Sequence, residues 1–198
     1  MEKYVAITGG IGSGKTLALG IIKKAGYKVF SADEVYRDML RDADFVKKVC
    51  SETGVPPIYE GDRLAIDRKA ISALVFSDRE FLKKLNSVTH PEIMMKMRSL
   101  AEKESGVVFA EVPLLFEGGF EDGFDFVIVL SRDEKARVKS AALRDGKREE
   151  DVEAVAKSQY DYGKLRPTDK ITVINNDGDE KALAEKILSV AKSIGETA

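Results

Sequence analysis

Near its N-terminus the chain reads Gly9-Gly10-Ile11-Gly12-Ser13-Gly14-Lys15-Thr16. This is a glycine, four residues and then Gly-Lys-Ser/Thr, the pattern of a phosphate-binding loop, or P-loop. The apolar segment Tyr4–Thr8 before it predicts a strand. The segment Lys15–Ala25 after it predicts a helix that stops at Gly26. Strand, loop and helix in this order are the context that the motif needs.

The residue types of this loop suit a polyphosphate. Glycines let the backbone wrap closely around phosphate groups, so that successive N–H groups point inward. The N-terminus of the following helix adds positive potential. Lys15 can bridge the terminal phosphates, and the Thr16 hydroxyl can bind Mg²⁺. The predicted nucleotide contacts are Gly10, Ile11, Gly12, Ser13, Gly14, Lys15 and Thr16.

The rest of the sequence predicts an α/β fold. Four more short apolar runs alternate with segments of helical periodicity: Tyr27–Phe30, Val107–Glu111, Phe126–Leu130 and Ile171–Asn175. Runs that are apolar on both faces are typical of a parallel sheet covered by helices on both sides. We therefore predict a P-loop NTPase-type sheet of five parallel strands sandwiched by helices. The C-terminal segment Glu180–Ile194 is apolar at helical spacing and is expected to pack on this sheet.

Two insertions interrupt this pattern. Between Asp33 and about Gly106 the strand pattern disappears, and three stretches predict helices with a turn around Pro56-Pro57 and Gly61: Asp33–Val49, Asp67–Phe76 and Arg79–Val88. We predict a helical subdomain at residues 33–106, inserted into a nucleotide-binding core of residues 1–32, 107–130 and 167–198. Residues 131–166 are rich in arginine and lysine and predict a mobile, basic, helical lid.

Composition excludes several classes of protein. The 198 residues carry 32 basic and 34 acidic side chains, and a net charge of −2 argues against a general nucleic-acid binder. Cys50 is the single cysteine, so no intramolecular disulfide can form and an ordinary buried thiol is expected. No apolar run approaches the roughly 18 residues of a membrane helix. We expect a cytoplasmic protein with neither nucleic-acid nor membrane partners.

Two carboxylates follow or end predicted strands. Glu111 ends an apolar run in the Walker B manner, so it is a candidate to hold Mg²⁺ through water; alternatively it is an acid capping a buried strand. Asp33 follows the second strand, and in an open parallel sheet the carboxyl ends of the strands form the ligand crevice. There Asp33 could accept a proton from an incoming hydroxyl; alternatively it caps the next helix.

A P-loop alone leaves the fate of the γ-phosphate undecided. Switch GTPases use an Asp-x-x-Gly element and an Asn-Lys-x-Asp guanine reader, and neither string occurs in this sequence. Further motifs are Ala32-Asp33, Asp67-Arg68-Lys69, Val75-Phe76, Leu85-Asn86, His90-Pro91-Glu92-Ile93, Pro113-Leu114-Leu115-Phe116-Glu117, Arg144-Asp145 and Asn175. Through these motifs and its P-loop, the chain resembles the dephospho-coenzyme A kinase family over most of its length.

This resemblance implies transfer of the ATP γ-phosphate to the ribose 3′-hydroxyl of dephospho-CoA, the last step of coenzyme A synthesis. Asp33 would accept the hydroxyl proton, and Lys15 and Thr16 with Mg²⁺ would hold the phosphates. Arg144 would neutralise transition-state charge, and Asn175 would contact the nucleotide. The implied acceptor contacts are Arg68, Phe76, Asn86, His90, Pro113, Leu114, Leu115 and Glu117. The two leucines also fit plain core positions, and His90 with Pro91 is expected at a helix end, where it would fix the backbone and line the acceptor pocket.

The sequence departs from the family pattern at several positions. Ser31 stands where the family usually has an aspartate, and Glu111 replaces the commoner aspartate. The usual lid pattern Gln-x-x-Arg-x-x-x-Arg-Asp has Arg137, Ser140 and Arg144 at its three marked positions. Arg137 and Arg144 would share one helix face, so Arg137 is a candidate substitute for the missing arginine.

Other functions stay open on the sequence alone. One is a P-loop kinase with a nucleoside, nucleotide or shikimate-like acceptor. Another, from a different class, is a nucleotide-dependent regulatory switch. A monomer or a weak homo-oligomer is expected.

Overall fold

The computed structural model describes residues 1–196, apart from the side chain of Phe76. The chain divides into two compact units. One comprises Met1–Ser31 together with the chain from Leu100 onward, and the other is Ala32–Ser99. Among residues 1–196, none of the helices combines the length and the apolar character that a membrane span requires.

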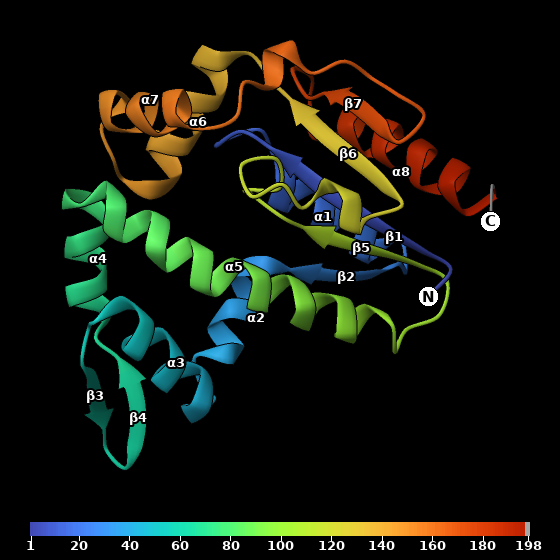
Figure 1. Ribbon diagram of the computed structural model, residues 1–198. Helices are drawn as coiled ribbons and strands as arrows, with labels where there is room; N and C mark the ends of the chain where they lie inside the picture. The colour runs from blue at the N-terminus through green and yellow to red at the C-terminus, as the bar shows by residue number, and fades with distance from the viewer. Residues whose placement is uncertain (197–198) are drawn as a thin grey trace. The chain divides into compact units, whose positions relative to one another are not determined.

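The first unit is built on a sheet of five parallel strands in the order β2-β5-β1-β6-β7 (Figure 1). The strands are β1 (Lys3–Gly9), β2 (Lys28–Ser31), β5 (Val107–Glu111), β6 (Phe126–Ser131) and β7 (Ile171–Asn175). This confirms the predicted sheet. Runs of Val, Ile and Phe identified the strands because both faces of the central strands are buried.

Two helices cover one face of this sheet: α1 (Lys15–Lys24) and α8 (Glu180–Glu196). Ile22 of α1 and Ile187 of α8 are fully buried in one cluster with Val5 and Ile128 from the strands. Complete burial of such a side chain is worth about 1.5–3 kcal/mol. The predicted packing of the C-terminal helix on the sheet is confirmed.

The strand register brings several carboxyl ends to one edge of the sheet. Glu111, at the end of β5, pairs with Ile7 of β1 on one side and with Ser31 of β2 on the other. Gly9, at the end of β1, pairs with Leu130 of β6. Because β1 leads directly into the P-loop, this edge is where the site forms.

The predicted lid segment, residues 131–166, is helical as expected and belongs to the first unit. It contains α6 (Glu134–Asp145), α7 (Glu149–Ser158) and the short 3₁₀ helix η2 (Tyr162–Lys164); a second 3₁₀ helix, η1 (Glu121–Gly123), precedes β6. α6 and α7 enclose a small apolar cluster of Val138, Ala141, Ala142, Val152 and Ala156. That residues 131–166 move as a lid stays a prediction.

The second unit consists of α2 (Ala32–Met39), α3 (Ala43–Thr53), β3 (Pro57–Glu60), β4 (Arg63–Ile66), α4 (Arg68–Ser77) and most of α5 (Arg79–Ala101). The expectation of helices alone is wrong, because β3 and β4 form an antiparallel hairpin. Gly61, with a φ angle of +63°, starts the two-residue turn between them. The strands are only four residues long and β3 is exposed throughout, so they lack the apolar run by which the other strands were identified.

Two predicted helix boundaries in this unit are also wrong. The segment predicted as one helix from Asp33 to Val49 is two helices, because Asp42 caps α3 through its carboxylate, which accepts hydrogen bonds from the backbone N–H groups of Asp44 and Phe45. α5 does not stop at Val88 but runs through Pro91.

His90 and Pro91 therefore lie inside a helix rather than at its end. Proline lacks the N–H that would bond to the carbonyl four residues earlier, a cost of about 3 kcal/mol within a helix. Apolar residues beyond it, Ile93 and Met97, are buried, and this burial offsets the loss.

Cys50 is buried in the apolar cluster of the second unit, with Phe45, Val49 and Phe81. Burial raises the pKa of its thiol, so the thiol stays protonated at neutral pH. This agrees with the expectation of an ordinary buried cysteine.

Candidate active site

The shape of the P-loop depends on glycine at two positions. Gly12 and Gly14 have φ angles of +74° and +100°, a region that residues with a Cβ rarely adopt. A Cβ on Gly12 would lie 2.0 Å from the backbone oxygen of Arg137. A Cβ on Gly14 would lie 2.4 Å from Nδ2 of Asn176. Backbone conformation and close approach of distant segments therefore both require glycine here.

Lys15 is the first residue of α1, and its ammonium group lies over the loop. Nζ donates hydrogen bonds to the backbone oxygens of Gly9 at 2.7 Å and Gly10 at 3.0 Å. Within the described residues, no side chain caps the N-terminus of α1 and its first turn carries no acid. The positive end of the helix and the lysine charge therefore act on the same loop, which favours a polyphosphate there.

Glu111 faces the P-loop from the end of β5. Its side chain is buried, and Oε1 accepts a hydrogen bond from Oγ1 of Thr16 at 3.2 Å. Neighbouring ligands of octahedral Mg²⁺ are about 3 Å apart when the metal–oxygen bonds are about 2.1 Å. A hydroxyl and a carboxylate at this separation fit Mg²⁺ that is also bound by phosphate and water. Residues 1–196 hold no group of three or more His, Cys, Asp or Glu side chains that would bind a metal without a nucleotide.

Arg144 is the basic residue in the last turn of α6. Its Nε and Nη2 donate to the two carboxylate oxygens of Asp145 at 2.6 and 2.8 Å. The hydrogen bond to Asp145 and the negative charges of Asp145 and Glu111 raise the pKa of Arg144. The arginine is thus a permanent cation within electrostatic range of the Glu111 carboxylate.

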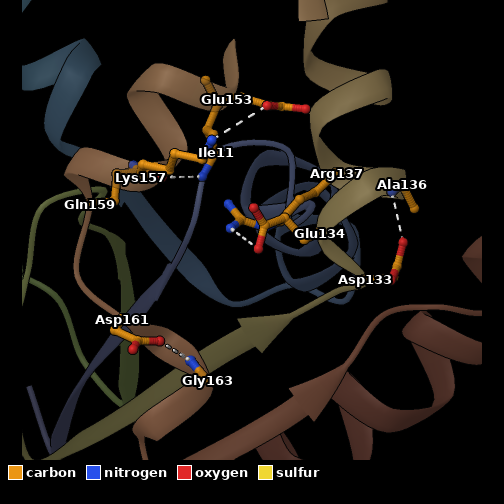
Figure 2. Close-up of polar contacts among 10 residues, drawn as sticks. All are labelled: Ile11, Asp133, Glu134, Ala136, Arg137, Glu153, Lys157, Gln159, Asp161 and Gly163. Atoms are coloured by element: carbon orange, nitrogen blue, oxygen red, sulfur yellow. Dashed lines mark hydrogen bonds and ion pairs between the residues drawn. The ribbon is translucent and has the colours of Figure 1, made fainter. Parts of the chain in front are cut away.

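Two further arginines of the predicted lid approach the P-loop (Figure 2 shows Arg137). A Cβ on Gly10 would lie 2.7 Å from Nη1 of Arg137, whose side chain is only 17% exposed. Nη1 of Arg132 donates to the Ser140 hydroxyl at 3.0 Å and, at 3.5 Å, to the backbone oxygen of Gly12. Ser140 stands where the family pattern has an arginine, and Arg132 supplies a guanidinium beside it.

The P-loop and this segment together line a cavity of about 300 Å³. It is lined by Gly10, Ser13, Leu130, Ser131, Arg132, Glu134, Arg137, Ala156, Lys157, Tyr160, Asp161, Tyr162 and Gly163. The phenol oxygen of Tyr162 lies 3.3 Å from Oγ1 of Thr8, at the end of β1. Burial raises the pKa of Tyr162 to about 12, so the phenol keeps its proton at neutral pH.

The turn that follows β5 carries four of the predicted acceptor contacts. Leu115 is fully buried, as a core residue would be, whereas Pro113 and Leu114 are half-buried. The carboxylate of Glu117 accepts a hydrogen bond from the backbone N–H of Tyr160 at 2.8 Å. This turn is therefore tied to the lid segment.

The asparagine that contacts the P-loop is Asn176, the residue after Asn175, for which a nucleotide contact stays a prediction. Asn176 is buried, and its Nδ2 donates to the backbone oxygen of Ser13 at 2.8 Å. The Asn175 side chain bonds to Asp177 instead. Its Nδ2 donates to the Asp177 carboxylate at 2.6 Å, and its Oδ1 accepts a hydrogen bond from the backbone N–H of Asp177 at 3.0 Å.

Asp33 lies in the first turn of α2, exposed, two residues beyond the end of β2. Because α2 begins at Ala32, Asp33 is inside the helix and is not its N-cap residue. The last residue of β2, Ser31, pairs with Glu111 in the sheet. The backbone at Asp33 is therefore joined by a very short stretch of chain to the sheet edge that holds Glu111.

The remaining predicted acceptor contacts belong to the second unit. Arg68 is the first residue of α4 and is exposed. Asn86 and His90 are four residues apart in α5, and both are partly exposed, so they share one face of that helix. The side chain of Phe76 lies outside the described part of the structure.

Comparison with known proteins decides the family. The family model described as dephospho-CoA kinase matches residues 3–182. The chain belongs to the dephospho-CoA kinase family. The dephospho-CoA kinase of Geobacillus kaustophilus is 33% identical over 200 residues, covering 97% of this chain and 96% of the relative.

Solved structures of similar proteins agree. A crystal structure from Thermus thermophilus superposes with a TM-score of 0.75 at 30% identity, covering 96% of this chain and 97% of that one. The dephospho-CoA kinase from Campylobacter jejuni superposes with a TM-score of 0.67 at 27% identity, covering 98% of both chains.

Membership of the dephospho-CoA kinase family makes the protein an ATP-dependent phosphotransferase. It favours a dephospho-CoA kinase over a kinase with another acceptor and over a regulatory switch. Sequence motifs missed three side chains that the structure places on the P-loop or beside it: Gln159, Tyr162 and Asn176. The sequence offered only weak signals for them. Gln159 and Tyr162 stand in a short polar and aromatic stretch before Gly163, and Asn176 is the second of two consecutive asparagines.

Proposed function

We propose that this protein transfers the γ-phosphate of ATP to the 3′-hydroxyl of the ribose of dephospho-CoA, which produces coenzyme A. The observation that carries this proposal is the family match over residues 3–182, which includes the P-loop, Glu111 and the α6–α7 segment. In this proposal the P-loop, Glu111 and the α6–α7 segment each take part in phosphate transfer.

The P-loop would hold the triphosphate. Positive φ angles at Gly12 and Gly14 give the loop the curvature by which backbone N–H groups can face phosphate oxygens, and α1 begins directly after Gly14. On binding ATP, Nζ of Lys15 would exchange its bonds to the Gly9 and Gly10 carbonyls for bonds to the terminal phosphates. Positive charge fixed in this way stabilises the charge that develops on the leaving ADP.

Thr16 and Glu111 would hold Mg²⁺ together with the phosphates. The ion, when bound, neutralises phosphate charge and orients the γ-phosphoryl group for in-line transfer. Glu111 would keep the Thr16 hydroxyl oriented through the 3.2 Å hydrogen bond between them.

Asp33 would accept the proton of the attacking hydroxyl. Its carboxylate is exposed in the first turn of α2, and β2 ends two residues earlier beside Glu111. The acceptor oxygen forms a bond to the γ-phosphorus while the bond to the ADP oxygen breaks, and the hydroxyl proton moves to Asp33. Phosphate transfer depends mainly on positioning and charge, so an ordinary carboxylate suffices as base.

Arg68, Phe76, Asn86 and His90 would bind the acceptor from the second unit, with Pro113, Leu114 and Glu117 from the turn after β5. Leu115 is better explained as core, since it is fully buried. A cytoplasmic location, and a monomer or weak homo-oligomer, stay predictions; light scattering after size-exclusion chromatography measures the latter.

The proposed function is tested by following two products at once. The purified protein is incubated with ATP and Mg²⁺, with and without dephospho-CoA, and ADP and coenzyme A are both quantified. We expect ADP release to rise strongly with dephospho-CoA and coenzyme A to appear in equal amount. Phosphorylation of a nucleoside monophosphate or shikimate in its place, with no coenzyme A formed, would contradict the proposal.

Glu111→Gln should weaken the binding of Mg²⁺ in the active enzyme. The amide keeps the size of the side chain but loses its charge, so we expect the Mg²⁺ concentration for half-maximal activity to rise about tenfold. A magnesium titration at fixed ATP measures this, with ATP affinity in EDTA as the control. An unchanged titration curve would assign Glu111 to a structural role at the strand end.

Arg144→Ala should lower kcat by about 10²-fold, because a lid cation that acts on transition-state charge is removed. Arg148 is the matched control: it is exposed and forms the same two-pronged pair, with Asp151. Arg148→Ala should keep kcat within about twofold, because exposed ion pairs contribute little. If Arg144→Ala keeps full activity and Arg137→Ala loses it, Arg137 is the lid cation.

A further inference from the structure

The side chain of Ile11 is held by the lid segment rather than by the rest of the P-loop. It packs against the cluster of Val138, Ala141, Ala142, Val152 and Ala156, which lies between α6 and α7. Ile11 therefore gives the glycine-rich P-loop an apolar contact with these two helices. Its methyl groups leave water when α6 and α7 lie on the loop, which favours that arrangement.

The backbone of Ile11 is held by the same segment. Its N–H donates a hydrogen bond of 2.7 Å to Oε1 of Gln159, the residue that directly follows α7 (Figure 2). Residues 11 and 159 are far apart in sequence, so only the folded lid segment brings this acceptor to the loop. The hydrogen bond fixes the direction in which this N–H points.

The neighbouring loop residues are covered too. The backbone of Arg137 approaches Gly12 so closely that a Cβ there would lie 2.0 Å from its carbonyl oxygen. Gly10 lies between the Arg137 guanidinium and Gln159: a Cβ there would be 2.7 Å from Nη1 of the first and 3.5 Å from Oε1 of the second. Three consecutive P-loop residues are therefore in contact with α6, α7 or the residue after them.

We propose that Ile11 and Gln159 are positioning residues that hold the α6–α7 segment on the P-loop and thereby direct phosphate to the acceptor rather than to water. The inference rests on the proposed function and adds to it the residues that set the choice of acceptor. In the competing hydrolysis, a water oxygen bonds to the γ-phosphorus, the bond to the β–γ bridging oxygen breaks, ADP leaves with that electron pair, and the water proton passes to solvent. A seated α6–α7 segment excludes that water.

The first test needs no substrate. Hydrogen–deuterium exchange is measured on wild type, Ile11→Ala, Ile11→Val, Gln159→Ala and a control, Val155→Ala, which shortens an exposed apolar side chain of α7. We expect amides of α6 and α7 to exchange about 10-fold faster in Ile11→Ala and Gln159→Ala, with β1 and α8 unchanged. Ile11→Val, which keeps most of the apolar contact, should fall between them and wild type, and Val155→Ala should match wild type.

The second test measures how well ATP consumption is coupled to product. Coenzyme A formed per ADP released is determined at saturating dephospho-CoA for the same variants. We expect the ratio to be near one in wild type and Val155→Ala and to fall about threefold or more in Ile11→Ala and Gln159→Ala, because water reaches the γ-phosphate. A residue needed only for folding would lower the amount of active enzyme and leave this ratio unchanged.

The outcomes separate the two proposals. If wild type forms no coenzyme A, the proposed function fails, whereas the exchange data still report on the docking. If Ile11→Ala and Gln159→Ala exchange in α6 and α7 as wild type does, or keep its product-to-ADP ratio, the positioning role is wrong. Should Ile11→Ala not fold, Ile11→Val and Gln159→Ala decide the question alone.

Discussion

Replacing Asp33 with asparagine should lower kcat by about 10³-fold, within the range that general bases contribute, and leave the fold intact. Asparagine has nearly the same size but cannot take the proton of the acceptor hydroxyl. Asp33 is exposed at the start of α2, so the substitution disturbs no packing. Turnover is measured at saturating ATP and dephospho-CoA, with thermal unfolding of both proteins for comparison.

The neighbouring residue supplies the control for this prediction. Glu34 is exposed in the same first turn of α2, so Glu34→Gln removes the same charge one position away. We expect Glu34→Gln to keep kcat within about twofold of wild type, because it only alters exposed charge. ATP affinity should be unchanged in both variants, since the P-loop is intact. Near-normal turnover in a folded Asp33→Asn protein would refute the assignment of Asp33 as base.

The strands of the sheet could be predicted because burial on both faces leaves a local signature. Segments such as Val107–Glu111 are short, apolar and rich in β-branched or aromatic residues, and the structure ends this strand at the same residues. The β3–β4 hairpin has no such signature: Ile58 and Tyr59 are exposed, and the strands pair only with each other. Its formation depends on a turn at Gly61 and on tertiary packing of Ile66, which a period search does not detect.

In the candidate site, too, the locally encoded parts could be predicted and the tertiary contacts could not. The P-loop could be recognised because eight consecutive residues make up the whole motif. Contacts from distant segments could not, since Gln159 and Asn176 reach Ile11 and Ser13 only in the folded chain. The sequence predicted a nucleotide contact for Asn175, the last residue of β7, and gave no clear sign that the next residue, Asn176, bonds to the P-loop. Sequence patterns report local conformation well and the identity of tertiary partners poorly.

The length of α5 shows how packing overrides a local signal. Proline usually marks a helix boundary, and the sequence predicted that His90 and Pro91 stand at one. The helix continues to Ala101 because buried residues follow at helical spacing, with Met97 fully buried. As a result, Asn86 and His90 lie on one continuous helix face, and His90 is not at a helix end.

Replacing Lys15 with alanine should have the second large effect, a loss of about 10³-fold in kcat/KM for ATP. The ammonium group is the one charged side-chain group within the P-loop motif, and its bonds to Gly9 and Gly10 already place it over the cradle. Its removal takes away a cation at the point where negative charge gathers as the γ-phosphate leaves. Steady-state kinetics with varied ATP measures the loss, and Lys24→Ala, at the exposed end of the same helix, is the matched control.

The division of this loss between kcat and KM distinguishes a role in ATP binding from a role in the transition state. If Lys15 only attracted ATP, KM would rise and kcat would stay near wild type. A cation placed for the transition state lowers kcat when removed, because its interaction strengthens as charge moves toward ADP. We expect most of the loss in kcat, with Lys15→Arg recovering little of it, since a bulkier, planar guanidinium does not place its charge where a compact ammonium would meet the terminal phosphates. A loss confined to KM, or full activity in Lys15→Arg, would show that bulk positive charge at the loop is enough and that the geometry at Nζ is not used.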